Sequence, residues 1–115
     1  MNTLSSAQSA MCRRFGVVGV APDPEDKLGI ALTSLHLVPL NAMRHRAVNG
    51  ECGWYIWAGE HLSEATDFFA PLHVAHLSQY APSLLPYIAL PHGWRVLLAP
   101  NVEDVWYDEG LRCAG

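Results

Sequence analysis

The sequence lacks the features that mark several large classes of protein. Its longest apolar runs fall well short of the about 18 residues that a membrane-spanning helix needs, so we expect no membrane partner. The first ten residues contain neither a basic segment nor an apolar segment of the kind found in a secretory signal. The sequence therefore predicts a cytoplasmic protein.

Cysteine is scarce, and the three cysteines form no CxxC pair. Cys12, Cys52 and Cys113 leave one thiol over under any pairing, which favours reduced thiols in a cytoplasm. Cys52 follows Asn49-Gly50 in a predicted glycine-rich turn, and nothing in the sequence supplies the nearby histidine that a thiolate nucleophile needs. There is no P-loop lysine, no complete dinucleotide-binding glycine motif and no G-x-S-x-G elbow. We therefore predict that the chain is not an enzyme.

Charge and aromatic residues are unevenly distributed along the chain. The formal net charge is -4, from 7 basic and 11 acidic residues. Residues 1–50 hold five basic and three acidic residues, for +2, whereas residues 51–115 hold two basic and eight acidic ones, for -6. All four Trp and all four Tyr residues fall in the same acidic half. Such a surface is unsuited to nucleic acid and suits a basic protein partner.

Periodicity predicts an α+β fold, a mostly antiparallel sheet with short helices inserted between the strand segments. We expect residues 1–11 to be a disordered N-terminal extension, with Met11 as an alternative start, and residues 12–115 to form one domain. Strands are predicted at residues 15–21, 54–58, 94–99 and 102–107, the last two joined in a hairpin through Pro100 and Asn101. Residues 28–32 fit either a strand or a connection. Short helices are predicted at 72–80 and 83–88.

The best candidate for a metal site is the pair His73 and His76, which would share one face of a helix. A third ligand could come from Glu60, His61 or Asp67. The pair lacks the glutamate and the spacing of a metalloprotease helix, and an exposed polar face accounts for it more simply. We predict no metal site and no cofactor.

The aromatic residues at 54–58 predict a sheet with large side chains on both faces. Trp54, Ile56 and Ala58 would share one face, and Tyr55 and Trp57 the other. Core packing explains one face, but the second needs its own cover, either helices of the chain or a partner. Acidic residues near these aromatics would attract a basic protein. The candidate partner-binding residues are Tyr55, Trp57, Glu60, Asp67, Glu103, Asp104 and Asp108.

Several motifs resemble the immunity protein 33 family, formerly a bacterial domain of unknown function. The most specific are GWYIWAGE at residues 53–60, Gly93-Trp94 and EDVW at 103–106. The segments DFF at 67–69, PLHVAHL at 71–77, LPY at 85–87 and LPHGWR at 90–95 resemble the family as well, so that the resemblance covers roughly residues 12–108.

The resemblance implies an immunity protein of a polymorphic toxin system, a small cytosolic protein that neutralises a toxin made by the same cell or its kin. It implies stoichiometric binding of a cognate toxin, with no catalysis, and the acidic candidates would meet Lys or Arg on that toxin. Two alternatives from the residues alone stay open. One is a non-enzymatic module that binds a peptide or small ligand, and the other is a metal-dependent hydrolase that uses His73 and His76.

Overall fold

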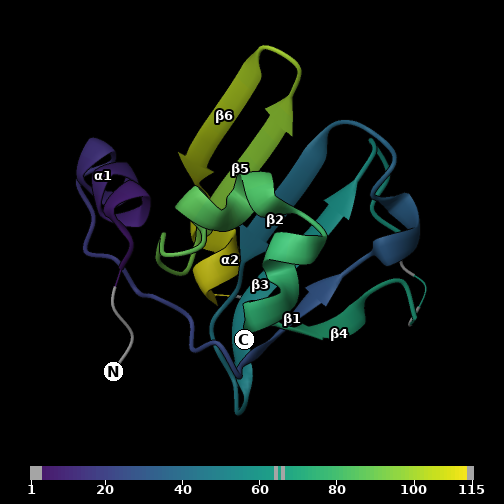
Figure 1. Ribbon diagram of the computed structural model, residues 1–115, viewed down its shortest axis with the longest axis horizontal. Coiled ribbons are helices and arrows are strands. Elements are labelled where there is room, and N and C mark those ends of the chain that lie inside the picture. Colours follow the sequence, from purple (N-terminus) through teal and green to yellow (C-terminus); the bar gives the residue numbers. More distant parts are fainter. Residues whose placement is uncertain (1–3, 64, 66, 114–115) are drawn as a thin grey trace.

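A six-stranded sheet runs through the molecule in the order β4-β1-β3-β2-β5-β6 (Figure 1). The computed structural model describes residues 4–63, 65 and 67–113. The β1–β3 pair is parallel and the four other neighbouring pairs are antiparallel. This arrangement confirms the α+β prediction. The strands are β1 (Lys27–Ile30), β2 (Leu40–Arg44), β3 (Glu51–Ala58), β4 (Ala70–His73), β5 (Trp94–Ala99) and β6 (Val102–Tyr107).

Short helices connect the strands, and two of them cross one face of the sheet (Figure 1). These two, η2 and η3, are 3-10 helices, and the side chains that they bury belong to the same core as the central strands. Helix α1 lies beside η3, where the side-chain amide of Gln8 donates to the carbonyl oxygen of Leu85 at 2.9 Å. The helices are α1 (Ser6–Arg14), η1 (Leu32–Ser34), η2 (Val74–Gln79), η3 (Pro82–Tyr87) and α2 (Glu109–Cys113).

The strands predicted at 54–58, 94–99 and 102–107 are confirmed as part of β3 and as β5 and β6. The predicted hairpin is confirmed too: Ala99 pairs with Val102, and Asn101 adopts a positive φ of 62° in the two-residue turn. The 28–32 segment resolves into strand β1 followed by η1. The short helix predicted at 83–88 is confirmed as η3, which spans Pro82–Tyr87 and so lies one residue earlier, with Pro82 at a first-turn position.

The N-terminal segment differs from the expected disordered extension, because most of it is helix α1. The hydroxyl of Ser5 accepts from the Gln8 backbone N–H at 3.1 Å, and the Gln8 side chain accepts from the Ser5 N–H at 3.0 Å. This reciprocal capping box satisfies two N–H groups that would otherwise lack partners at the helix start. Cys12 anchors the helix in the core.

The prediction of a buried strand at residues 15–21 is wrong. The segment is an irregular connection in which Val18 is 86% exposed. It lies beside residues 88–90 instead of a strand, and the Val20 N–H donates to the Ala89 carbonyl oxygen at 2.8 Å. Its valines favour a strand, but Gly16 and Gly19 interrupt them and no neighbouring strand provides a ladder.

The helix predicted at 72–80 begins too early. Residues 70–73 form β4, in which Leu72 pairs with Leu28 of β1, and the helix η2 starts only at Val74. Strand β2 was not predicted at all. It lies between β3 and β5, and residues 40–43 of β2 pair with both of these strands.

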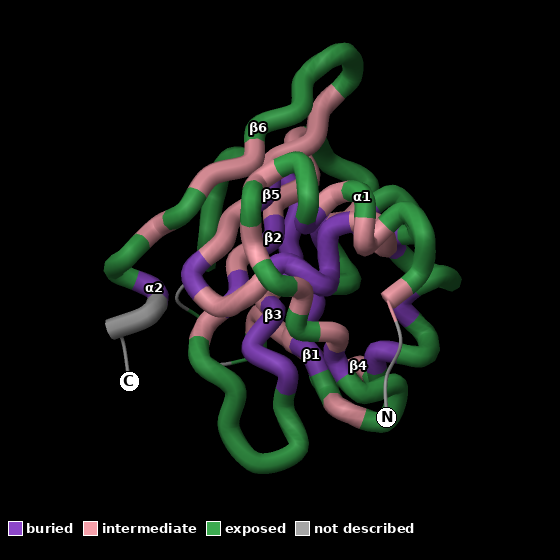
Figure 2. Tube along the Cα trace, turned by 90° about the vertical axis from the view of Figure 1, so that its left-hand side faces the viewer, coloured by how far each residue is buried: buried purple, intermediate pink, exposed green. Residues whose placement is uncertain are grey.

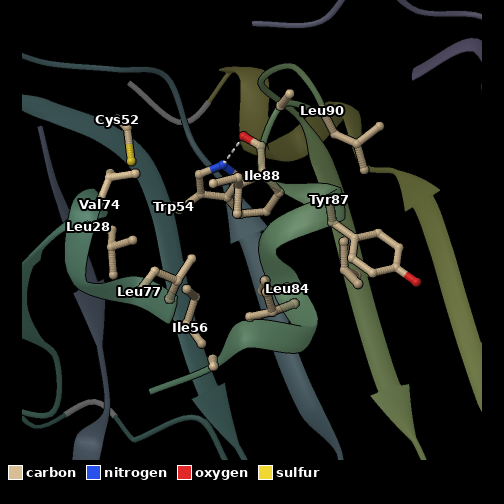
Figure 3. Packing of buried hydrophobic residues seen from close by; sticks show 14 of the residues in the cluster. Leu28, Cys52, Trp54, Ile56, Val74, Leu77, Leu84, Tyr87, Ile88 and Leu90 are labelled. Atoms are coloured by element: carbon tan, nitrogen blue, oxygen red, sulfur yellow. Dashed lines mark hydrogen bonds between the residues drawn. The ribbon is translucent and has the colours of Figure 1, made fainter. Parts of the chain in front are cut away.

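The hydrophobic core lies between the sheet and the helices η2 and η3 (Figure 3). We call this side of the sheet the Trp54 face, because Trp54 at 1% exposure is the largest side chain in it. The indole N–H of Trp54 donates to the Ile88 carbonyl oxygen at 2.8 Å, so the ring is buried without an unsatisfied donor. Figure 2 shows the buried residues gathered at the centre of the sheet and the β5–β6 hairpin tip exposed. The core residues on the strands include Leu28, Ile30, Ala42, Cys52, Trp54, Ile56 and Val96.

Arg44 is buried on the same face at 2% exposure, and backbone carbonyl groups surround it. Its Nε donates to the backbone carbonyl oxygen of Cys52 at 3.0 Å. Its Nη1 donates to the carbonyl oxygens of Val20, Ile88 and Leu90 at 2.6, 3.2 and 2.9 Å. Burial lowers the pKa of the guanidinium from its ordinary value. The hydrogen bonds offset part of that desolvation and tie the 15–21 connection and the 88–90 segment to the sheet.

Candidate functional site

The opposite side of the sheet, which we call the Tyr55 face, carries aromatic residues at its β1–β3 end. Tyr55 and Trp57 lie on this face because they alternate with Trp54 and Ile56 along β3, as predicted. The ring of Phe69 lies edge-on to both, with centroids 5.1 Å from Tyr55 and 6.3 Å from Trp57. Phe68 packs in turn against Phe69 at 4.9 Å. The four rings form one T-shaped cluster.

Glycine at position 29 allows this cluster to form. Gly29 pairs with Tyr55 across the parallel β1–β3 ladder, and a Cβ at that position would lie 2.7 Å from Cδ1 of the Tyr55 ring. Any larger residue would displace the ring. Burial raises the pKa of Tyr55, which is half-buried here, whereas Trp57 is only 5% exposed. Trp57 thus supports the surface from below, and Tyr55 presents more of its ring to solvent.

The Tyr55 face continues across β2 to the hairpin. Register places Met43 opposite both Tyr55 and Arg95, and Arg95 opposite Trp106. The Arg95 guanidinium stacks over the Trp106 ring at 5.3 Å from its centroid, and its Nη1 donates to the Asp108 carboxylate at 3.2 Å. These groups are all half-buried. The predicted residue Asp108 is therefore paired within the chain.

Asp104 lies on the same face, since it pairs with Leu97 and alternates with Trp106 along β6. Its side chain is exposed. Of the described residues, none donates a hydrogen bond to its carboxylate or forms an ion pair with it. Asp104 is thus an acidic group at the hairpin that is available to a partner.

Glu103, the neighbour of Asp104, points to the Trp54 face. Its carboxylate accepts two hydrogen bonds from Arg14 of α1, at 2.6 and 3.1 Å, and a third from the Tyr87 hydroxyl of η3. The Arg14 hydrogen bonds, followed by the Tyr87 hydroxyl, hold the pKa of Glu103 below its usual range. Burial, with the Glu103 carboxylate nearby, raises the pKa of Tyr87 to about 12. Glu103 thus links α1 and η3 to the hairpin.

The two remaining acidic candidates lie in the segment between β3 and β4. Glu60 follows Gly59 at the end of β3, and Asp67 precedes Phe68; both are exposed. The structure therefore gathers Tyr55, Trp57, Asp104 and Asp108 on one side of the sheet, with Glu60 and Asp67 in the loop that carries the Phe69 ring to it. Glu103 lies on the opposite side.

The histidines of the candidate metal pair do not share one helix face, because His73 ends strand β4 and His76 lies in η2. The rings of His73 and His76 lie 6.1 Å apart at the junction of β4 and η2, and the Glu25 carbonyl oxygen lies 3.0 Å from His73 Nδ1. In the part of the chain that the structure describes, no three His, Cys, Asp or Glu side chains are grouped to hold a metal ion.

The sequence predicted Cys52 in a turn, but the structure places it in strand β3. It is buried on the Trp54 face, and burial raises the pKa of its thiol, which disfavours the reactive thiolate. The turn lies earlier, where Gly50 adopts a φ of 73° and Val48 bridges to Glu51. Gly53 also has a positive φ of 94°, and a Cβ there would collide with the His45 carbonyl oxygen.

Sequence reasoning missed Phe69 and Arg95 as parts of the Tyr55 face. Phe69 follows the irregular segment after β3, so no periodicity indicated which face it would join. Arg95 was identifiable once residues 94–99 were assigned to a strand, because alternation places it opposite the buried Val96. Arg44 left no signal in the sequence, since arginine is rarely buried.

These features define an α+β domain with one sheet, a helix-covered core face and a second face rich in aromatic and acidic residues. Residues 7–108 match the model of the Imm33-like domain, and the chain belongs to that family. Comparison with curated proteins and with solved structures gave no match. Among the described residues, no helix is both long enough and apolar enough to cross a membrane.

Proposed function

We propose that this protein is a cytoplasmic immunity protein that neutralises a cognate bacterial toxin by stoichiometric binding, without catalysis and without a cofactor. The observation that carries the proposal is membership of the Imm33-like family over residues 7–108 of 115. The thiol of Cys52 is buried and burial raises its pKa, so it is unsuited to nucleophilic catalysis and supports a binding role.

The contact with the toxin is centred on the Tyr55 face. Half-buried aromatic residues there offer apolar area at a low entropic cost of ordering, which is typical of residues that dominate binding energy. Tyr55 and Asp104 make direct contacts in this proposal, and Trp57 supports them from beneath. Acidic groups border this area and attract Lys or Arg of the toxin. The proposed contact residues on or beside this face are Tyr55, Trp57, Glu60, Asp67, Asp104 and Asp108, and Glu103 is the one proposed contact on the opposite side of the sheet.

The acidity of residues 51–115, with a net charge of -6, makes the proposed association electrostatic in part. Opposite charges accelerate encounter at low ionic strength, and salt screens them over a Debye length of about 8 Å at 0.15 M. We expect the association rate constant to fall as salt is raised. An association rate that stays constant between low and high salt would contradict the electrostatic part of the proposal.

The proposal predicts that a toxin domain is encoded in the reading frame next to this chain, and the experiment that tests the proposed function uses that domain. Co-expression of the two should restore growth to cells that the toxin domain alone arrests, and the two should co-purify as a one-to-one complex. A non-toxic variant of that domain, selected by loss of growth arrest, provides the control for binding without toxicity. Failure both to restore growth and to co-purify would overturn the proposal.

A further inference from the structure

The two edges of the sheet differ in how they present their backbones. Strand β4, at one edge, has four residues and contains Pro71, which has no N–H to donate to another strand. Strand β6, at the other edge, has six residues and no proline. The β5–β6 hairpin also extends beyond the rest of the sheet in both views (Figures 1 and 2).

The register of the hairpin identifies which backbone groups of β6 face outward. The Asp108 N–H donates to the Gly93 carbonyl oxygen at 2.7 Å, so this pair is hydrogen-bonded in the antiparallel ladder. Hydrogen-bonded and non-bonded pairs alternate, and Trp94–Tyr107 is therefore a non-bonded pair. By the same alternation, Glu103, Val105 and Tyr107 direct their N–H and C=O groups away from β5.

Nothing in the described part of the chain occupies this edge. Strand β6 pairs with β5 alone, and its backbone makes no hydrogen bond to any other described segment. Among the described residues, helix α1 forms hydrogen bonds to β6 through the Arg14 side chain, which binds the Glu103 carboxylate, and none to the β6 backbone. The edge is thus a template for one more strand.

The side chains of β6 indicate what kind of strand fits. Asp104 is exposed and without a cation among the described residues, so a strand with Lys or Arg beside it gains a favourable cross-strand pair. A second copy of this chain fits poorly. Antiparallel pairing of two β6 strands about their centres brings Asp104 of one copy opposite or diagonally next to Asp104 of the other.

The C-terminal end of β6 adds an apolar anchor. Tyr107, 43% exposed, forms one wall of a hollow of about 370 Å³ together with Trp94, Val17, Pro91 and His92. The Trp94 and Tyr107 rings meet edge-on at 5.9 Å. Gly93 makes room for this arrangement, because a Cβ there would lie 2.6 Å from Cε1 of Tyr107. An apolar side chain carried by a strand added to β6 would fit this hollow.

We propose that β6 binds an extended, basic segment of the cognate toxin as an additional strand of the sheet, with a Lys or Arg of that segment beside Asp104. This inference rests on the proposed function and specifies how the toxin is held. Backbone hydrogen bonds would supply affinity, and Asp104 with the hollow would supply specificity.

Residue-resolved amide hydrogen exchange tests the proposal, with the inactivated toxin domain as the probe. In the free chain, the outward amides of Glu103, Val105 and Tyr107 should exchange rapidly, whereas those of Asp104 and Trp106 donate to β5 and should exchange slowly. On complex formation the three outward amides should slow by about tenfold or more, and the two inward amides should stay slow.

The possible outcomes separate the two proposals. A one-to-one complex in which the three outward amides still exchange rapidly would overturn strand addition and leave the proposed function standing. No complex at all would overturn both. Protection of these amides in the chain alone, rising with its concentration, would identify a second copy as the occupant and contradict a toxin strand.

A proline substitution provides a second test. Val105→Pro removes one outward N–H without removing a hydrogen bond to β5, and it should weaken toxin binding by about tenfold or more. The control, Ile56→Val, mildly destabilises the Trp54 face away from β6 and should leave the affinity within about twofold. Equal affinities for the Val105→Pro variant and the unmodified chain, with both folded by thermal unfolding, would contradict strand addition.

Discussion

The two faces of the sheet are built from alternating residues of the same strands, yet they differ in how deeply their side chains are buried. On the Trp54 face, Trp54 and Arg44 are almost fully buried, and their polar groups are bonded to backbone carbonyls. On the Tyr55 face, Tyr55, Arg95 and Trp106 are half-buried, and Asp104 is exposed. The difference indicates that the first face maintains the fold, and it is the reason that we place toxin binding on the second.

The largest effect is expected from Trp54→Ala on the Trp54 face. The substitution opens a cavity and leaves the Ile88 carbonyl oxygen without its indole donor, for a loss of about 4 kcal/mol in the free energy of unfolding. Urea unfolding followed by circular dichroism measures it. Trp106→Ala, on the other face, should cost clearly less, because that ring is only half-buried. Equal losses would remove the distinction between the faces.

Arg44→Met should cost about 3 kcal/mol, because it removes the charged donor that four backbone carbonyls share. The methionine fills much of the volume but donates nothing. Arg46→Met provides the matched control, since Arg46 is exposed, and its cost should stay below about 0.5 kcal/mol. If thermal unfolding gave the two variants the same stability, the hydrogen bonds from Arg44 to the four backbone carbonyls would not be important to the fold.

Asp104→Lys should separate binding from stability. We expect it to weaken toxin affinity by about tenfold to a hundredfold, through like-charge repulsion, with the free energy of unfolding changed by less than about 0.5 kcal/mol. Glu25→Lys makes the same change in net charge at an exposed site before β1, and it should affect affinity much less. Biolayer interferometry with the inactivated toxin domain measures both. Matching losses would show that net charge alone, and not the site, governs binding.

The smallest effect concerns the link between α1 and the hairpin. Because Arg14 and Tyr87 lower the pKa of Glu103, the link stabilises the fold above the ordinary glutamate value of 4.5. Its contribution is lost as the pH falls through the lowered pKa, where the folded carboxylate takes up its proton. Glu103→Gln should remove this portion of the pH dependence of unfolding below the ordinary glutamate value, as measured by urea unfolding at a series of pH values. An unchanged profile would contradict the assignment.

The strands that flank a clear turn were predictable, and those without such a boundary were not. Residues 94–99 and 102–107 carry Val and aromatic residues on both sides of the Pro100-Asn101 turn, so both strands and their hairpin followed from the sequence. Strand β2 ends in Arg44, whose burial depends on carbonyls of Val20, Ile88 and Leu90 that only the folded chain brings together. No local pattern could have indicated it.

At the N-terminus, the start of α1 did carry a local signal, Ser5 followed by Gln8 in the pattern of a capping box. The valine-rich segment at 15–21 misled in the opposite direction, because strand propensity cannot supply a neighbouring strand. For the candidate site, alternation placed Tyr55 and Trp57 on one face. It could not foresee that Phe69 would cover Trp57, since that contact joins residues across an irregular segment.

The central claim is that this chain neutralises its toxin by stoichiometric binding. Isothermal titration calorimetry of the chain with the inactivated toxin domain tests it most directly. We predict one-to-one binding with a dissociation constant below about 1 μM. The absence of measurable binding, with both proteins folded, would contradict the account.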